Sequence, residues 1–241
     1  MLKYNGSILK LPSKAIVNYD TPPVPPAPSY PSDMDFIYLA NNFDGSQITN
    51  SVTGANAFGP YLEQGTITKN GSGSSCYLSN DDSTSNYLYI DLTSAQLSNM
   101  QPTSGNAYTF FIRVHSTSSN VGAIFSWRMD NSSNYIYMIR ANNGKLHLHS
   151  TSGYDSNFDL DESEVYKVVV EYNKITAYKL STGSTFAISN SSFRMGTRMS
   201  TFVVYSYESV LDRMYGLAGI ARATTEAEDT VIKNILLNQS V

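Results

Sequence analysis

Short apolar stretches separated by polar, turn-forming residues recur along the chain from Asp33 onward. In several of them apolar and polar positions alternate, which is the period of a β-strand with one buried face. Clusters of Gly, Asn, Asp and Ser lie between them and favour turns. The expected strands are 36–39, 86–91, 108–115, 122–128, 135–140, 145–149, 166–172, 174–180, 201–205 and 215–220. About ten strands without intervening helices predict an antiparallel sandwich.

Two further segments carry the pattern of a helix. Segment 93–100 begins with Thr93 and Ser94, either of which can cap a helix N-terminus. Near the end of the chain, Thr225 and Glu228 have capping-box spacing, and an apolar stripe follows them. The predicted fold class is therefore all-β, an antiparallel jelly-roll β-sandwich with a C-terminal helix and an N-terminal arm.

The first 32 residues differ from the rest of the chain. Asn5-Gly6 separates two short apolar stretches and favours a hairpin, and 15–17 offers another short strand. Seven of the nine prolines lie in the first 31 residues, where they favour an extended polyproline II spacer. A ligand for an SH3-type groove is the alternative interpretation. We divide the chain into a docking arm (1–20), a spacer (21–32) and a sandwich (33–241). The arm residues expected to contact a partner are Leu2, Tyr4, Ile8, Leu11, Ile16 and Val17.

Composition narrows the functional classes. Charged residues are 15% of the chain, against roughly 25% in ordinary soluble domains, and 18 residues are Tyr. A net charge of −4 argues against nucleic-acid binding. No apolar run reaches the length of a transmembrane helix. The single cysteine, Cys76, cannot form an internal disulfide.

The first residues and the overall composition favour different cellular locations. The first residues, Met1 to Gly6, contain no long apolar segment of a secretory signal, so we expect a protein that is made and kept in a cytoplasm, or that leaves by a route other than general secretion. A surface rich in Tyr, Ser, Thr and Asn is nevertheless typical of a protein that faces the outside. A virus particle reconciles the two, because its parts are made in the host bacterial cytoplasm and act outside. This start also resembles the openings of some phage structural proteins.

Four segments occur in the order typical of one superfamily. They are the first strand with its turn Phe43-Asp44-Gly45-Ser46, the strand 108–115, the hairpin 166–180 continuing to Gly183, and the end 216–228. In this order they resemble the concanavalin A-like lectin/glucanase superfamily, specifically its laminin-G-like or pentraxin-like modules. The resemblance implies a concanavalin A-like sandwich over about residues 33–241. Lectins, glycosidases and structural modules share that fold, so function must be argued from the site.

The sequence does not present a catalytic constellation. Glucanases of this superfamily carry their acids on one strand as E-x-D-x-x-E or close to it, and no strand here has that pattern. Asp159, Asp161 and Ser163 come nearest, but they precede a strand and predict a solvated turn. No G-x-S-x-G surrounds any serine. We assign no catalytic residue and expect a protein that is not an enzyme.

Metal binding is left as an open alternative. His147 and His149 would point the same way on a strand, but a metal would need a third ligand that the sequence does not identify. Modules of this superfamily often hold calcium in loops rich in Asp and Asn. Asp130, Asn131 and Asn134 offer such oxygens, although these loops are more often plain turns. We therefore expect no cofactor, with calcium as the open alternative.

Sugar recognition is the remaining chemistry. Aromatic rings stack on sugars, and planar polar groups bond their hydroxyls. Such side chains lie on three consecutive expected strands, where the alternation assigns Trp127 to the core. The candidate ligand-binding residues are Arg128, Tyr135, Tyr137, Arg140, His147 and His149. An ordinary Tyr-rich sheet face is the alternative.

These observations lead to one functional hypothesis. The chain is expected to be a non-enzymatic bacteriophage appendage, decoration or fibre protein. Its arm would dock on other virion proteins, and its sandwich would face outward for weak adhesion to cell-surface or mucus glycans, or for a structural role. Such arms work by strand addition, so we expect a homo-oligomer. We expect neither nucleic acid nor membrane insertion. A bacterial carbohydrate-binding module and, after it, a glycosidase of the same fold are the alternatives.

Overall fold

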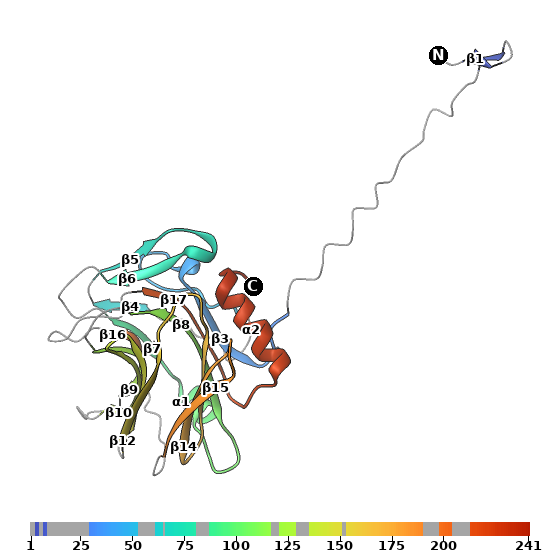
Figure 1. Cartoon of the computed structure of the whole chain (residues 1–241). Helices are drawn as coiled ribbons and strands as arrows, with labels where there is room; N and C mark the ends of the chain where they lie inside the picture. The colour runs from blue at the N-terminus through green and yellow to red at the C-terminus, as the bar shows by residue number, and fades with distance from the viewer. Residues whose placement is uncertain are drawn as a thin grey trace.

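The computed structural model describes residues 3–4, 7–8, 29–52, 61–64, 66–80, 87–116, 121–128, 135–150, 153–189, 198–203 and 213–241. Two antiparallel β-sheets face each other, and a C-terminal helix lies against the outside of one of them (Figure 1). This is the predicted sandwich. No helix in the described ranges has the length and apolar character needed to cross a bilayer.

The sheet that carries the helix has eight strands. Its order is β15-β14-β13-β8-β17-β6-β5, and β3 also pairs with β17. The strands are β3 (Met34–Leu39), β5 (Ile67–Asn70), β6 (Tyr77–Asn80), β8 (Tyr108–His115), β13 (Tyr166–Val170), β14 (Lys174–Lys179), β15 (Ser184–Ser189) and β17 (Arg213–Ile220).

The facing sheet has seven strands in the order β12-β11-β10-β9-β16-β7-β4. They are β4 (Tyr61–Gln64), β7 (Tyr87–Asp91), β9 (Val121–Arg128), β10 (Tyr135–Asn142), β11 (Lys145–Ser150), β12 (Gly153–Asp159) and β16 (Arg198–Val203). The hairpin between β10 and β11 turns through Asn143 and Gly144, both with positive φ, as the Asn-Gly signal predicts.

The predicted N-terminal hairpin is present. Strands β1 (Lys3–Tyr4) and β2 (Ser7–Ile8) pair antiparallel around Asn5-Gly6. The further strand expected at 15–17, the spacer residues 21–28, and the arm residues Leu11, Ile16 and Val17 lie outside the described residues, as do the side chains of Leu2, Tyr4 and Ile8. The docking role of the arm therefore stays a prediction.

Two apolar clusters hold the layers together. The larger fills the space between the sheets and contains stacked aromatic rings, such as Phe36 on Tyr38 with centroids 4.6 Å apart. The second lies on the outer face of the eight-stranded sheet, where Ile232, Ile235 and Leu236 of the C-terminal helix are buried. Strands such as β8 are thus buried on both faces, which explains their nearly continuous apolar sequence.

Both predicted helices begin at the predicted caps. Helix α1 (Ser94–Met100) starts after Thr93, and α2 (Glu226–Asn238) starts after Thr225; each N-cap threonine forms a complete capping box. Two single-turn 3₁₀ segments, η1 (Ala40–Asn42) and η2 (Gly73–Ser75), complete the described elements.

Candidate functional site

The strands predicted to carry a ligand site do form a meander. β9, β10 and β11 are neighbours, with Tyr135 in register opposite Arg128, and Arg140 opposite His147. The side chains of Arg128, Tyr135, Tyr137, Arg140 and His149 lie outside the described residues. Their part in ligand binding stays a prediction.

His147 is the member of that set whose surroundings the structure describes, and it is not where we expected it. Its side chain is 1% exposed rather than on a solvated face. β11 lies between β10 and β12, away from the sheet edge, and is buried at Leu146 and Leu148 as well. His147 therefore has no surface to offer a ligand.

The other chemical predictions have mixed outcomes. Residues 161–163 form the expected exposed turn, in which the Asp161 carboxylate accepts hydrogen bonds of 2.8 Å from the backbone N–H and the hydroxyl of Ser163. The calcium-loop residues Asp130, Asn131 and Asn134 lie outside the described residues. Within the described part of the chain, no three His, Cys, Asp or Glu side chains come together as metal ligands would.

A pocket that the sequence did not indicate opens at one end of the eight-stranded sheet. Its volume is about 450 Å³, within the range of small-ligand sites. We call it the loop-end pocket. Three loops line it through Thr103, Ser104, Gly105, Asn106, Ala107, Glu171, Tyr172, Asn173, Arg222 and Ala223.

Strand register explains why these loops meet. Val170 at the end of β13 pairs with Tyr108 at the start of β8, and Ile220 at the end of β17 pairs with Thr109. The loop after β13, the loop before β8 and the loop after β17 therefore emerge at the same end of the sheet. The Thr109 hydroxyl donates to the Arg222 carbonyl oxygen (2.7 Å) and ties two of these segments together.

Tyr172 lies at the rim of the loop-end pocket, on the hairpin between β13 and β14. It is 44% exposed, more than any other aromatic residue whose side chain the structure describes. Glu171 and Asn173 flank it and are exposed too. The turn is closed by a backbone hydrogen bond from Glu171 to Lys174 (2.8 Å). No residue in the described ranges hydrogen-bonds to the side chains of Glu171, Tyr172 or Asn173, so their polar groups are free to meet a ligand.

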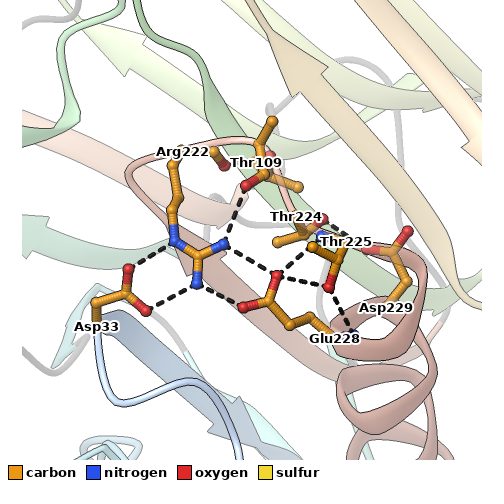
Figure 2. A network of polar contacts seen from close by, with 8 residues as sticks. Asp33, Thr109, Arg222, Thr224, Thr225, Glu228 and Asp229 are labelled. Carbon is orange, nitrogen blue, oxygen red and sulfur yellow. Dashed lines mark hydrogen bonds and ion pairs between the residues drawn. The ribbon is translucent and has the colours of Figure 1, made fainter.

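Arg222 forms a wall of the loop-end pocket, and its guanidinium is held by hydrogen bonds to neighbouring groups. Figure 2 shows its guanidinium between two carboxylates: Nε and Nη2 donate to Asp33 (2.6 and 2.9 Å), and Nη1 and Nη2 donate to Glu228 (3.0 and 2.6 Å). Glu228 also accepts from the backbone N–H of Thr225 (2.8 Å). This network joins the start of the sandwich to the N-terminus of α2 and fixes the wall.

The same contacts shift the pKa values of Asp33, Arg222 and Glu228. The hydrogen bonds from Arg222, then those from Thr225, lower the pKa of Glu228 to about 2. The hydrogen bond from Arg222 likewise lowers the pKa of Asp33, and both acceptors raise the pKa of Arg222. The wall is therefore ionised throughout the neutral range, and its one positive and two negative charges leave it with a net charge of about −1.

The loop-end pocket thus combines an exposed ring, one free carboxylate and one free carboxamide with a rigid wall. A ring face packs on the C–H surface of a sugar, while a carboxylate and an amide bond neighbouring hydroxyls. The sequence predicted the hairpin around Asn173 but not this site. Its three loops are far apart in sequence, and their meeting depends on strand order.

Comparison with known proteins identifies the fold. No protein-family model and no curated protein sequence matches the chain. Among solved structures, the receptor-binding domain of botulinum neurotoxin mosaic serotype C/D has a TM-score of 0.56 at 11% identity, covering 86% of this chain and 51% of that chain. A botulinum neurotoxin type C structure, described with the dependence of its cell entry on interaction with two ganglioside molecules, gives 0.57 at 11% identity, covering 85% and 51%.

A Trypanosoma rangeli sialidase mutant displaying trans-sialidase activity gives a TM-score of 0.60 at 6% identity, covering 87% of this chain and 34% of that chain. The chain thus spans about half the length of the neurotoxin domains and about a third of the sialidase. At these identities the similarity shows the fold alone. The chain therefore has the concanavalin A-like β-sandwich fold that its sequence resembles.

Proposed function

We propose that the chain is a glycan-binding module that holds sugars at the loop-end pocket without cleaving them. The observation that carries the proposal is the exposed ring of Tyr172, flanked by the free polar groups of Glu171 and Asn173. An exposed aromatic ring beside free polar groups suits a sugar, because a sugar offers both an apolar C–H face and hydroxyl groups. The lectin-type fold agrees with this use.

The described part of the pocket has too few free carboxylates for glycoside hydrolysis, which favours binding without cleavage. Glycosidases of this kind need two carboxyl groups, an acid and a nucleophile or base, on either side of the bond. Among the residues that line the pocket, Glu171 alone carries a carboxylate. The nearby carboxylates of Asp33 and Glu228 are bonded to Arg222.

A glycan array tests the binding proposal. Labelled full-length chain should give saturable signals for a subset of saccharides, and Tyr172→Ala should reduce them by about tenfold or more, as loss of a central aromatic contact does. Lys174→Ala, on the same hairpin but outside the pocket, should leave them unchanged. Signals for neutral saccharides that persist in Tyr172→Ala would contradict the site. Release of reducing ends from a bound saccharide would contradict the non-enzymatic part.

We further propose that this module is part of a bacteriophage particle, with the arm (1–20) docked on another virion protein and the spacer holding the sandwich outward. The support is the hairpin at Asn5-Gly6, the proline-rich segment and the low-charge surface. A hairpin of two-residue strands buries too little surface to be stable alone, so a partner is expected to cover it.

Removal of the arm and spacer tests the docking role independently of glycan binding. The Tyr30 hydroxyl donates to the carbonyl oxygen of Ser51 (3.2 Å), and its ring packs on the outer cluster, so the cut is best placed before Ser29. Chain lacking residues 1–28 should keep its thermal transition and its array signals but fail to assemble into particles. Normal incorporation of the truncated chain would refute the docking role.

A further inference from the structure

A second cavity of about 540 Å³ lies beside the C-terminal end of α2, away from the loop-end pocket. We call it the arginine pocket. Two guanidinium groups line it, from Arg113 on β8 and Arg213 on β17. The full lining is Ser74, Ser75, Tyr77, Arg113, Glu162, Ser163, Arg213, Tyr215, Leu237 and Asn238. The proposed function does not use these residues.

Arg113 holds the end of the helix and still has a free edge. Arg113 is buried, and its Nη1 donates to two carbonyl oxygens in the last turn of α2, those of Leu236 (3.0 Å) and Leu237 (3.1 Å). Its Nε donates to the carbonyl oxygen of Glu162 (2.8 Å). No described residue accepts from Nη2, and Nη2 is not sealed from solvent. The unused N–H groups of Nη2 are therefore available to a ligand in the pocket.

Contacts hold the guanidinium of Arg213 in place and leave some of its hydrogen-bond donors unused. Its Nη1 donates to Glu162 Oε2 (2.9 Å), and its guanidinium lies 4.8 Å from the ring centroid of Tyr77. Tyr215 donates to the same Glu162 oxygen (2.5 Å), while the guanidinium of Arg113 covers the Tyr215 ring at 4.3 Å. Within the described ranges nothing accepts from Nε or Nη2 of Arg213.

The charges and the rings decide the ligand class. Two guanidinium groups against one carboxylate leave the pocket with a net charge of about +1 in a chain of net charge −4. The hydrogen bond from Tyr215 and the charge of Arg213 lower the pKa of Glu162. Glu162 is therefore ionised at neutral pH, and its negative charge is counted in the net charge of the pocket. Because the two tyrosine rings are covered by guanidinium groups, they are poor platforms for a neutral sugar.

We propose that the arginine pocket binds the carboxylate of an acidic saccharide, a uronic acid residue. Guanidinium edges match a planar carboxylate, and such charge-assisted bonds are the strong ones. Other polar groups line the same pocket and can meet sugar hydroxyls: the hydroxyls of Ser74, Ser75 and Ser163, the Asn238 amide and the second oxygen of Glu162. The choice of a saccharide rests on the proposed glycan-binding function, whereas the carboxylate rests on the arginines alone.

Protein-observed NMR titration of the full chain tests the proposal with three probes: glucuronate, glucose and acetate. Glucuronate should shift resonances of the pocket, and glucose at the same concentration should not. Acetate should bind at least about tenfold more weakly than glucuronate, because it lacks the hydroxyls. Equal binding of glucose, equal binding of acetate, or no response to glucuronate would each overturn the proposal.

Three variants locate the effect. Arg213→Gln, at a partly exposed side chain, should weaken glucuronate binding by about tenfold. Glu162→Gln removes the competing charge and should strengthen it by about threefold. Lys145→Gln, which removes one positive charge outside the pocket, should change nothing. Weaker binding in Glu162→Gln, or equal losses in the Arg213 and Lys145 variants, would overturn the assignment.

One variant distinguishes the proposed site at the loop-end pocket from the one at the arginine pocket. Tyr172→Ala should leave glucuronate binding at the arginine pocket intact, because Tyr172 lies in the other pocket. Loss of the array signals for neutral saccharides in that variant, with unchanged glucuronate titration, supports both sites. Loss of glucuronate binding in Tyr172→Ala would place the acidic sugar at the loop-end pocket and contradict the arginine pocket.

Discussion

Replacing Asp35 by Asn should stabilise the protein, and more so at neutral than at acidic pH. The Asp35 side chain is 1% exposed and lies where the pairing of β3 with β17 is irregular. One carboxyl oxygen accepts from the Asn99 amide of α1 (3.1 Å). The Tyr108 hydroxyl interacts with the carboxyl, but neither it nor Oδ2 has a hydrogen bond of full geometry. A carboxylate here is therefore poorly compensated.

The magnitude follows from the pKa. Desolvation raises the pKa of Asp35 from 3.8 to about 6, against the smaller lowering effects of Tyr108 and Asn99; the charge of Asp33 adds a small increase. Between these values the folded protein holds a proton that the unfolded chain has lost, so the free energy of unfolding falls as pH rises through this window. At 1.36 kcal/mol per pKa unit, the full cost of ionisation at neutral pH is about 3 kcal/mol.

Urea denaturation of wild type and Asp35→Asn at pH 4.5 and pH 7.5 measures this cost. The advantage of Asn over Asp should be about 2 kcal/mol larger at pH 7.5, because most of the titration window lies between the two values. Asp155→Asn, which removes an exposed carboxylate from β12, should change stability by less than about 0.5 kcal/mol at either pH. An advantage that does not change with pH, or that is larger at pH 4.5, would refute a buried, poorly compensated carboxyl.

Two further predictions concern the packing of strand β17 and the ion-pair network of Arg222. Gly219→Ala should cost about 1–3 kcal/mol in thermal or urea unfolding, because a Cβ there would lie 2.4 Å from an aromatic ring carbon of β3. Gly105→Ala, where a Cβ meets nothing within 4 Å, is the control, and equal costs would contradict the close packing. The lowered pKa values of Asp33 and Glu228 give stability that is present above about pH 4.5 and lost as pH falls toward 2. Arg222→Gln should reduce this loss between pH 5 and pH 3; an unchanged acid profile would contradict the role of the network.

The alternation of apolar and polar residues predicted most of the fold. Strands with a strong pattern, such as 108–115, have the expected bounds, and both helices start at the expected threonines. The strands that were missed are short or polar. β12 reads Gly-Tyr-Asp-Ser-Asn-Phe-Asp, and β15 alternates only weakly. Their strand structure comes from pairing with β11 and β14 rather than from local preference.

The candidate sites were harder to predict, for two physical reasons. Alternation tells which residues share a face but not whether that face is covered, and His147 proves to be buried. Both pockets also depend on long-range pairing. Arg113 and Arg213 come together because their strands β8 and β17 are neighbours, and no local pattern encodes that. Glu162, interpreted as part of a plain solvated turn, contributes to the arginine pocket from that turn.

In the proposed complex a sugar lies on the ring of Tyr172. Titration of one neutral saccharide that is positive on the array, against wild type, Tyr172→Phe and Tyr172→Ala, measures what the ring contributes. Tyr172→Phe, which keeps the ring, should bind within about threefold of wild type, and Tyr172→Ala should bind about tenfold or more weakly. Equal affinity of the Ala variant and wild type, with the fold intact, would contradict it.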